Sequence, residues 1–157
     1  MPEPDDRDSL DILKAPLRRL PELKELQFRL AGFAVGLALL VTLAPTWLTR
    51  DYGDGQLIYS GIGMIHFTDH SPKSPMGGLG TFLFLLYLVL ALAALLPPTE
   101  TIFALVRGGA GLVVTILILV SKPDHPTLGW TGAPVVALGL WLLAVVVAGV
   151  ARTTTRG

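Results

Sequence analysis

Three histidines and two aspartates are the residues of this chain best suited, by type and spacing, to bind a metal ion. His66, Asp69 and His70 lie in the segment HFTDH, and Asp124 and His125 lie in the segment KPDHP. Imidazole and carboxylate groups bind divalent cations such as zinc, and a four-residue spacing places two imidazoles on one side of a helical turn. If the two segments converge, these residues predict a divalent-metal site. A pH-sensing role for the histidines and ordinary solvated loops are the alternatives that stay open.

Arg107 is a second candidate, because it is an ionisable residue inside an otherwise apolar segment that runs from Thr101 to Ser121. Its position corresponds to about 9 Å of helix after Thr101. Such an arginine could recognise an anionic head group in a transporter or a lipid-handling protein, or its long side chain could reach back to the membrane surface. We expect the second behaviour. No Asp or Glu lies inside any apolar segment, which disfavours a transporter with a midplane carboxylate.

The overall composition places these candidates in a membrane protein. The chain has 157 residues, 52% of them hydrophobic and only 15% charged, and its mean hydropathy is +0.62. A soluble domain is far less apolar than this. The formal net charge is zero and no long run of Lys or Arg occurs, which excludes a nucleic-acid partner. There is no cysteine and no catalytic motif, so we expect a protein that is not an enzyme and has no cofactor beyond the possible divalent metal.

Four long apolar segments predict an all-α membrane protein, a bundle of four transmembrane helices. A helix rises 1.5 Å per residue, so about 20 apolar residues cross a hydrocarbon core of roughly 30 Å. The predicted order is a cytoplasmic amphipathic segment at residues 1–28, spans at residues 29–48, 78–97, 102–121 and 130–151, extracytoplasmic loops at residues 49–77 and 122–129, a cytoplasmic turn at residues 98–101, and a cytoplasmic tail at residues 152–157.

The distribution of basic residues predicts the orientation of this bundle. With both termini on the inside, nine of the 12 Lys and Arg residues fall on the inner side. The outer side keeps only Arg50, Lys73 and Lys122. Inner loops carry the excess of Lys and Arg in membrane proteins. We therefore expect a multi-pass protein of a bacterial inner membrane with both termini in the cytoplasm.

The long first outer loop predicts a small β-hairpin. The stretch GQLIYSGIGMIHF is rich in β-branched and aromatic residues and is interrupted by Gly61 and Gly63, which suggests two short strands with a turn between them. Four helices with a longer first outer loop that contains a β-element resemble the layout of claudin-like tetraspan proteins. The Gly-Leu-Trp and paired-cysteine signature of that family is absent here, so no residue role is carried over.

Small residues and exposed aromatic residues suggest how the bundle packs and what it contacts. Glycines let helix backbones approach closely in membranes, and exposed aromatic residues are frequent in protein interfaces. The residues expected at helix contacts are Gly32, Gly36, Gly108, Gly109 and Gly111. The residues expected on a docking surface of the first outer loop are Tyr52, Tyr59 and Phe67.

These observations together predict a protein that is not an enzyme and that acts as an accessory or scaffold subunit of a larger inner-membrane complex. Its expected partners are membrane lipids and other membrane-protein subunits. A small transporter or lipid-handling protein that uses Arg107 is the first alternative. A metal-binding or sensory protein that uses the outer histidines is the second.

Overall fold

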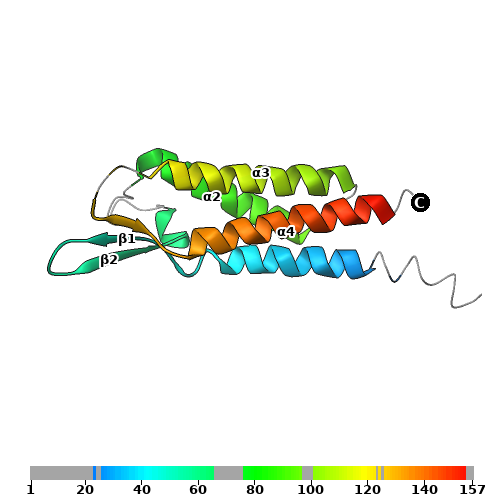
Figure 1. Ribbon diagram of the computed structural model, residues 1–157, viewed down its shortest axis with the longest axis horizontal. Helices are drawn as coiled ribbons and strands as arrows, with labels where there is room; N and C mark the ends of the chain where they lie inside the picture. The colour runs from blue at the N-terminus through cyan, green and yellow to red at the C-terminus, as the bar shows by residue number, and fades with distance from the viewer. Residues whose placement is uncertain are drawn as a thin grey trace, which may run out of the picture.

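The computed structural model describes residues 23, 26–65, 76–96, 101–122, 124 and 126–154. These residues form a mostly helical protein with a small sheet at one end (Figure 1). The helices are an N-terminal helix at Leu26–Val41, α2 at Gly77–Leu95, α3 at Thr101–Val120 and α4 at Ala133–Thr154. The strands are β1 at Thr46–Asp51, β2 at Gln56–Ser60 and β3 at Leu128–Trp130, and the short 3₁₀ helix η1 spans Ile62–Met64.

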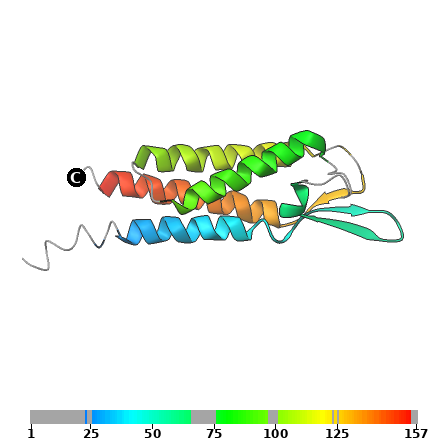
Figure 2. The ribbon, with the colours of Figure 1, turned by 180° about the vertical axis from the view of Figure 1, so that it is seen from behind.

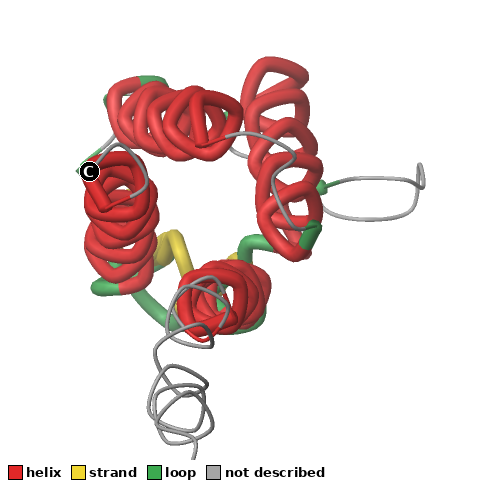
Figure 3. The backbone as a smooth tube through the Cα atoms, turned by 90° about the vertical axis from the view of Figure 1, so that its right-hand side faces the viewer, coloured by secondary structure: helices red, strands yellow, loops and turns green. Residues whose placement is uncertain are grey.

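The helices run along the long axis of the molecule and surround a common interior. Figure 3 looks along this axis from the end that carries the C-terminus. Among the three long helices, α3 is in the middle and packs against both α2 and α4. The helix α2 is tilted relative to the others, so that its C-terminal end approaches the N-terminal helix (Figure 2). The sheet lies at one end of the bundle, and the start of the N-terminal helix and the end of α4 lie at the other (Figure 1).

Three helices, α2, α3 and α4, are long and apolar enough to cross a membrane. Only 22% to 33% of the residues in their most apolar windows are buried within the protein, so most of their apolar side chains point outward. A soluble helix of this composition would hide such a surface, whereas a bundle in lipid exposes it. The N-terminal helix is apolar too but shorter, with 16 residues from Leu26 to Val41, or about 24 Å.

The sheet contains three antiparallel strands in the order β2-β1-β3. β1 is central, with Arg50 opposite Leu57 of β2 and opposite Leu128 of β3. The β1–β2 loop is tight: Gly53 has φ +82°, whereas Asp54 does not adopt positive φ. Glycine at the first central position is what a type II′ hairpin requires. Its twist matches that of the two strands, and the hairpin projects beyond the helix ends (Figure 1).

The position of this hairpin differs from the sequence-based prediction. Strand pairing around Gly61 and Gly63 was expected, but β2 pairs with the upstream β1, and η1 follows β2. The N-terminal helix ends at Val41 instead of continuing to residue 48. Pro45 explains the early end, because proline has no N–H for the helix ladder and restricts the residue before it. Hydropathy counted Trp47 and Leu48 as part of a span, although both are buried by the protein itself.

The link between α3 and α4 also differs from its predicted structure. Residues 122–129 were expected to be a simple loop, but Leu128–Trp130 form β3 on the other side of β1. α4 consequently begins at Ala133 instead of residue 130. The expected spans 78–97 and 102–121 differ from α2 and α3 by no more than two residues at either end. The predicted fold class is therefore confirmed in part: the described chain is mostly helical, with three long apolar helices and a fourth, shorter one, and it also contains a small sheet.

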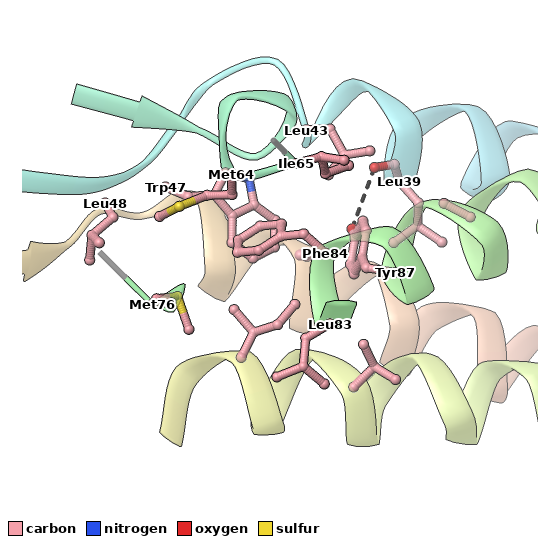
Figure 4. Packing of buried hydrophobic residues seen from close by; sticks show 14 of the residues in the cluster. Leu39, Leu43, Trp47, Leu48, Met64, Ile65, Met76, Leu83, Phe84 and Tyr87 are labelled. Atoms are coloured by element: carbon pink, nitrogen blue, oxygen red, sulfur yellow. Dashed lines mark hydrogen bonds between the residues drawn. The ribbon is translucent and has the colours of Figure 1, made fainter. Parts of the chain in front are cut away.

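A group of aromatic side chains fills the interior near the sheet. Trp47 of β1 meets Phe84 of α2 edge to face, with ring centroids 5.0 Å apart, and it meets Tyr87 at 5.5 Å (Figure 4). Tyr87 in turn meets Trp141 of α4 at 5.8 Å. All four rings are fully buried. Edge-to-face pairs add about 0.5 to 1.5 kcal/mol each beyond the burial of their area, so this aromatic core joins the sheet to two helices.

Candidate functional site

Most of the predicted metal ligands lie outside the described residues. This holds for His66, Asp69, His70 and His125, and Asp124 is the one ligand candidate that the structure describes. Among the described ranges, no group of three or more His, Asp or Glu side chains is close enough to hold a metal ion. The metal site therefore stays a prediction from the sequence.

Arg107 lies against the C-terminal end of α2. Its Nη1 donates hydrogen bonds to the carbonyl oxygens of Ala93, at 2.5 Å, and Leu96, at 3.2 Å. The N–H of Leu96 also donates to the Ala93 carbonyl, at 3.1 Å, so Arg107 is a second donor there. Carbonyls at a helix C-terminus carry a partial negative charge, so a cation is favourable beside them. Pro97 and Pro98 end α2 at this point in the sequence and could have suggested where carbonyls need a donor. Arg107 therefore fastens the start of α3 to the end of α2.

The five glycines predicted at helix contacts divide into two groups. A Cβ added at Gly36 would lie 2.8 Å from the backbone of Ala94, and one at Gly108 would lie 2.8 Å from the side chain of Val145. At Gly111 it would overlap the ring of Trp141. At Gly32 and Gly109 it would meet nothing within 4 Å. Close helix contact thus requires glycine at three of the positions, and the remaining two lie in open space.

A hydroxyl cluster anchors the sheet end of the N-terminal helix. Thr42 Oγ1 donates to the carbonyl of Leu39 at 2.6 Å and lies 2.7 Å from the hydroxyl of Tyr87. The indole N–H of Trp47 donates to the carbonyl of Thr42 at 2.6 Å. Figure 4 shows the Tyr87 hydroxyl directed at Leu39, 3.4 Å from its carbonyl. These bonds supply partners to carbonyls that the helix end leaves unsatisfied, and no pattern in the sequence indicated them.

The hairpin is held firmly to the bundle at its base. The N–H of Ile62 donates to the carbonyl of Leu43 at 3.1 Å, and Gly61 lies so close to Leu43 and Trp47 that a Cβ there would clash. On the other side of β1, the N–H of Thr131 donates to the carbonyl of Trp47 at 3.0 Å. Two neighbouring residues after β2 and one residue after β3 make these contacts. They fasten the base of the sheet to the segment that follows the N-terminal helix.

The hairpin and the residue just beyond it present apolar side chains that no residue in the described part of the chain covers. The exposed residues are Tyr52, Leu57, Ile58 and, just beyond β2, Ile62. We call these four residues the docking surface. Ile58 is the most exposed at 66%, and it lies on the sheet face opposite the one that carries Leu48. An exposed apolar surface of this kind, at the projecting end of an anchored element, is typical of protein interaction sites.

The residues predicted to form a docking surface differ in their exposure. Tyr52 is exposed, and the guanidinium of Arg50 lies 4.8 Å from the centroid of its ring. Tyr59 was expected to be exposed, and this was wrong. Its side chain is only 7% exposed, because it pairs with Leu48 on the buried face of the sheet. Phe67 lies outside the described residues. Leu57, Ile58 and Ile62 were missed, although alternation along QLIYS would have placed Leu57 and Tyr59 on one face and Ile58 on the other.

The charges near the docking surface are mostly acidic. Asp51 and Asp54 are exposed at the hairpin tip, and neither forms an ion pair with any residue in the described part of the chain. Arg50 lies on the sheet face of Leu57 and stacks on Tyr52, whereas Asp51 lies on the face of Ile58. The tip thus offers apolar contact, two unpaired carboxylates and backbone groups. These are means of binding.

Comparison with known proteins assigns no family to the chain. No protein-family model matches it, and neither a curated protein nor a solved structure does. The resemblance to claudin-like proteins therefore stays one of layout.

Proposed function

We propose that this protein crosses a bacterial inner membrane four times, with both termini in the cytoplasm. Three helices of sufficient length and apolarity support the spans. The N-terminal helix supports the fourth, because it carries outward apolar residues, Leu30, Phe33, Leu37 and Val41, and lies alongside α2 in the same bundle. Its shorter length of about 24 Å is compatible with a span, since bilayers thin locally at modest cost. The excess of Lys and Arg near the two termini supports the orientation.

Single cysteines test this topology directly, because the natural chain contains none. Asp54→Cys at the hairpin tip and Thr153→Cys near the C-terminus are both exposed positions. A maleimide that does not cross membranes should label Asp54→Cys in intact cells and should label Thr153→Cys only after lysis. Labelling of Thr153→Cys in intact cells would overturn the four-span topology.

We further propose that the protein is not an enzyme and acts as an accessory subunit, which uses the docking surface to hold a partner subunit outside the cytoplasm. The observation that carries this proposal is the anchored hairpin with uncovered apolar residues, Leu57 and Ile58 above all. Soluble surfaces rarely keep such residues at a projecting tip without a partner. We favour the subunit role over a transporter because Nη1 of Arg107 donates to helix carbonyls.

Purification in mild detergent tests the subunit role. The wild-type protein should migrate together with a second polypeptide. Leu57→Lys should release this partner, because the substitution places a charge in an apolar contact. Thr153→Lys adds the same charge at the opposite end of the bundle and serves as the matched control. A complex that is equally stable in both variants would show that the hairpin is not the docking site. A wild-type protein that migrates alone would contradict the subunit role.

A further inference from the structure

The two outer edges of the sheet are treated differently. At the β3 edge, Lys122 donates from Nζ to the carbonyl of Leu128 at 2.8 Å, and β3 itself has only three residues. Lysines and short strands are devices by which proteins prevent further strands from adding. The β2 edge has neither device. Its sequence, QLIYS, contains no charge and no proline, and no strand in the described part of the chain pairs with its outer side.

The hairpin register identifies the backbone groups at this open edge. The N–H of Tyr52 donates to the carbonyl of Gly55 at 2.9 Å, which makes these two residues a hydrogen-bonded pair. Bonded and non-bonded pairs alternate along an antiparallel ladder. Leu57 and Tyr59 therefore bond to β1, and the N–H and carbonyl groups of Gln56 and Ile58 point away from it. These groups form a template for one more strand.

A second copy of the chain does not fit this template. The hairpin runs along the bundle axis (Figure 1), so in one membrane every copy presents β2 in the same direction. A two-fold axis along the bundle would set Ile58 opposite Ile58 in parallel strands. In a parallel ladder, a residue whose N–H and carbonyl point to the neighbouring strand lies between two such residues of that strand, not opposite one. Two copies related by this two-fold axis would therefore form no ladder. The other edge that a second copy could offer, β3, is occupied by Lys122.

The side chains around the open edge define what an added strand must carry. Asp51 of β1 pairs with Gln56 of β2, and Thr49 pairs with Ile58, so Asp51 lies on the same sheet face as Ile58 and diagonal to it. An antiparallel strand would place one residue beside Ile58 and, two positions later, one beside Gln56. The first should be apolar. The second should be basic, because Asp51 and Asp54 are exposed and unpaired in the described part of the chain.

We infer that β2 binds an extended segment of a different polypeptide as a fourth, antiparallel strand, and that this segment carries an apolar residue followed two positions later by Lys or Arg. The inference rests on the proposed function and specifies how the docking surface works. Main-chain hydrogen bonds supply affinity in this binding mode, and alternate side chains supply specificity.

Defined peptides test the inference on the full chain in lipid nanodiscs. The probe is a blocked eight-residue peptide of alternating Val and Thr with Lys two positions after a central Val, and its matched control has Glu at that position. By fluorescence anisotropy the Lys peptide should bind about tenfold more tightly, which corresponds to 1.4 kcal/mol. It should also slow amide hydrogen exchange in Gln56–Ser60. Equal binding of both peptides, or binding without slower exchange, would overturn the inference, and so would no binding.

Ile58→Pro separates strand addition from other kinds of contact. It removes an N–H that points away from β1, so the hairpin ladder stays intact while the template is broken. Peptide binding should be lost in Ile58→Pro and retained in Thr153→Lys, an exposed position at the opposite end of the bundle. If Leu57→Lys releases the natural partner but Ile58→Pro binds the partner and the peptide like the wild type, the subunit role stands and strand addition is wrong. If neither variant affects the natural complex, both proposals fail.

Discussion

Near the sheet, the helices are held together by large rings and hydroxyl groups, whereas near the chain termini they are held by close backbone contacts. The first half contains Trp47, Phe84 and Tyr87, all fully buried. The second half contains the approach of Gly36 to Ala94 and the hydrogen bonds of Arg107. The difference shows that one bundle can pack in two ways. Large buried side chains fill the space between the helices and the sheet, and small residues let helix backbones approach where no sheet is present.

Removing a ring from the sheet half should have the largest effect. Phe84→Ala deletes a fully buried ring that packs on Trp47, and we expect a loss of about 3 to 5 kcal/mol in the free energy of unfolding. Phe82→Ala is the matched control on the same helix, because Phe82 faces outward. Thermal unfolding in detergent measures both. Equal losses would mean that the aromatic core does not support the sheet half.

Enlarging a glycine in the terminal half should have the next largest effect. Gly36→Leu forces a side chain against the backbone of Ala94, and overpacking of this kind costs about 1 to 3 kcal/mol. Gly32→Leu should leave the unfolding temperature unchanged or higher, because the added side chain meets nothing within 4 Å and leucine favours helix. A similar loss in both variants would show that the Gly36 contact is not what joins these helices.

Arg107 makes a polar contact in the terminal half, where the helices otherwise meet through small residues. Arg107→Ala leaves the carbonyls of Ala93 and Leu96 without this donor, at a cost of about 1 to 3 kcal/mol. Arg107→Lys should lose less, since an ammonium still reaches helix carbonyls but lacks the planar fork. Stability equal to wild type in Arg107→Ala would remove the capping role.

The smallest expected effect is the loss of one hydroxyl from the sheet half. Tyr87→Phe keeps the ring contacts with Trp47 and Trp141 and removes the bond to Thr42, for a loss of about 0.5 to 1.5 kcal/mol. Thr42 still donates to Leu39 in this variant, which limits the damage. A loss as large as that of Phe84→Ala would mean that the hydroxyl cluster outweighs the aromatic packing.

The sequence by itself determined the helices of this protein. Apolar runs of the right length, closed by Pro97 and Pro98 in one case, define α2 and α3 to within two residues. For helices that cross a membrane, as we propose for these, the reason is that a hydrocarbon solvent demands both apolar side chains and internally bonded backbone, and both demands are local. The glycines at helix contacts were likewise visible as a group. Which of them touch a neighbour depends on the crossing of helices, so only the structure separates Gly36 from Gly32.

Only the tertiary structure determined which strands pair in the sheet and which partners the polar residues contact. The strand β1 lies in a stretch that hydropathy joined to a span, and β3 lies in a short link some 80 residues away. Their pairing depends on contacts between distant segments, which no local pattern encodes. The same holds for Tyr59, buried through its pairing with Leu48, and for Arg107, whose partners belong to another helix. The residue types and their local sequence indicated that these residues matter. Contacts between distant segments determined what each of them touches.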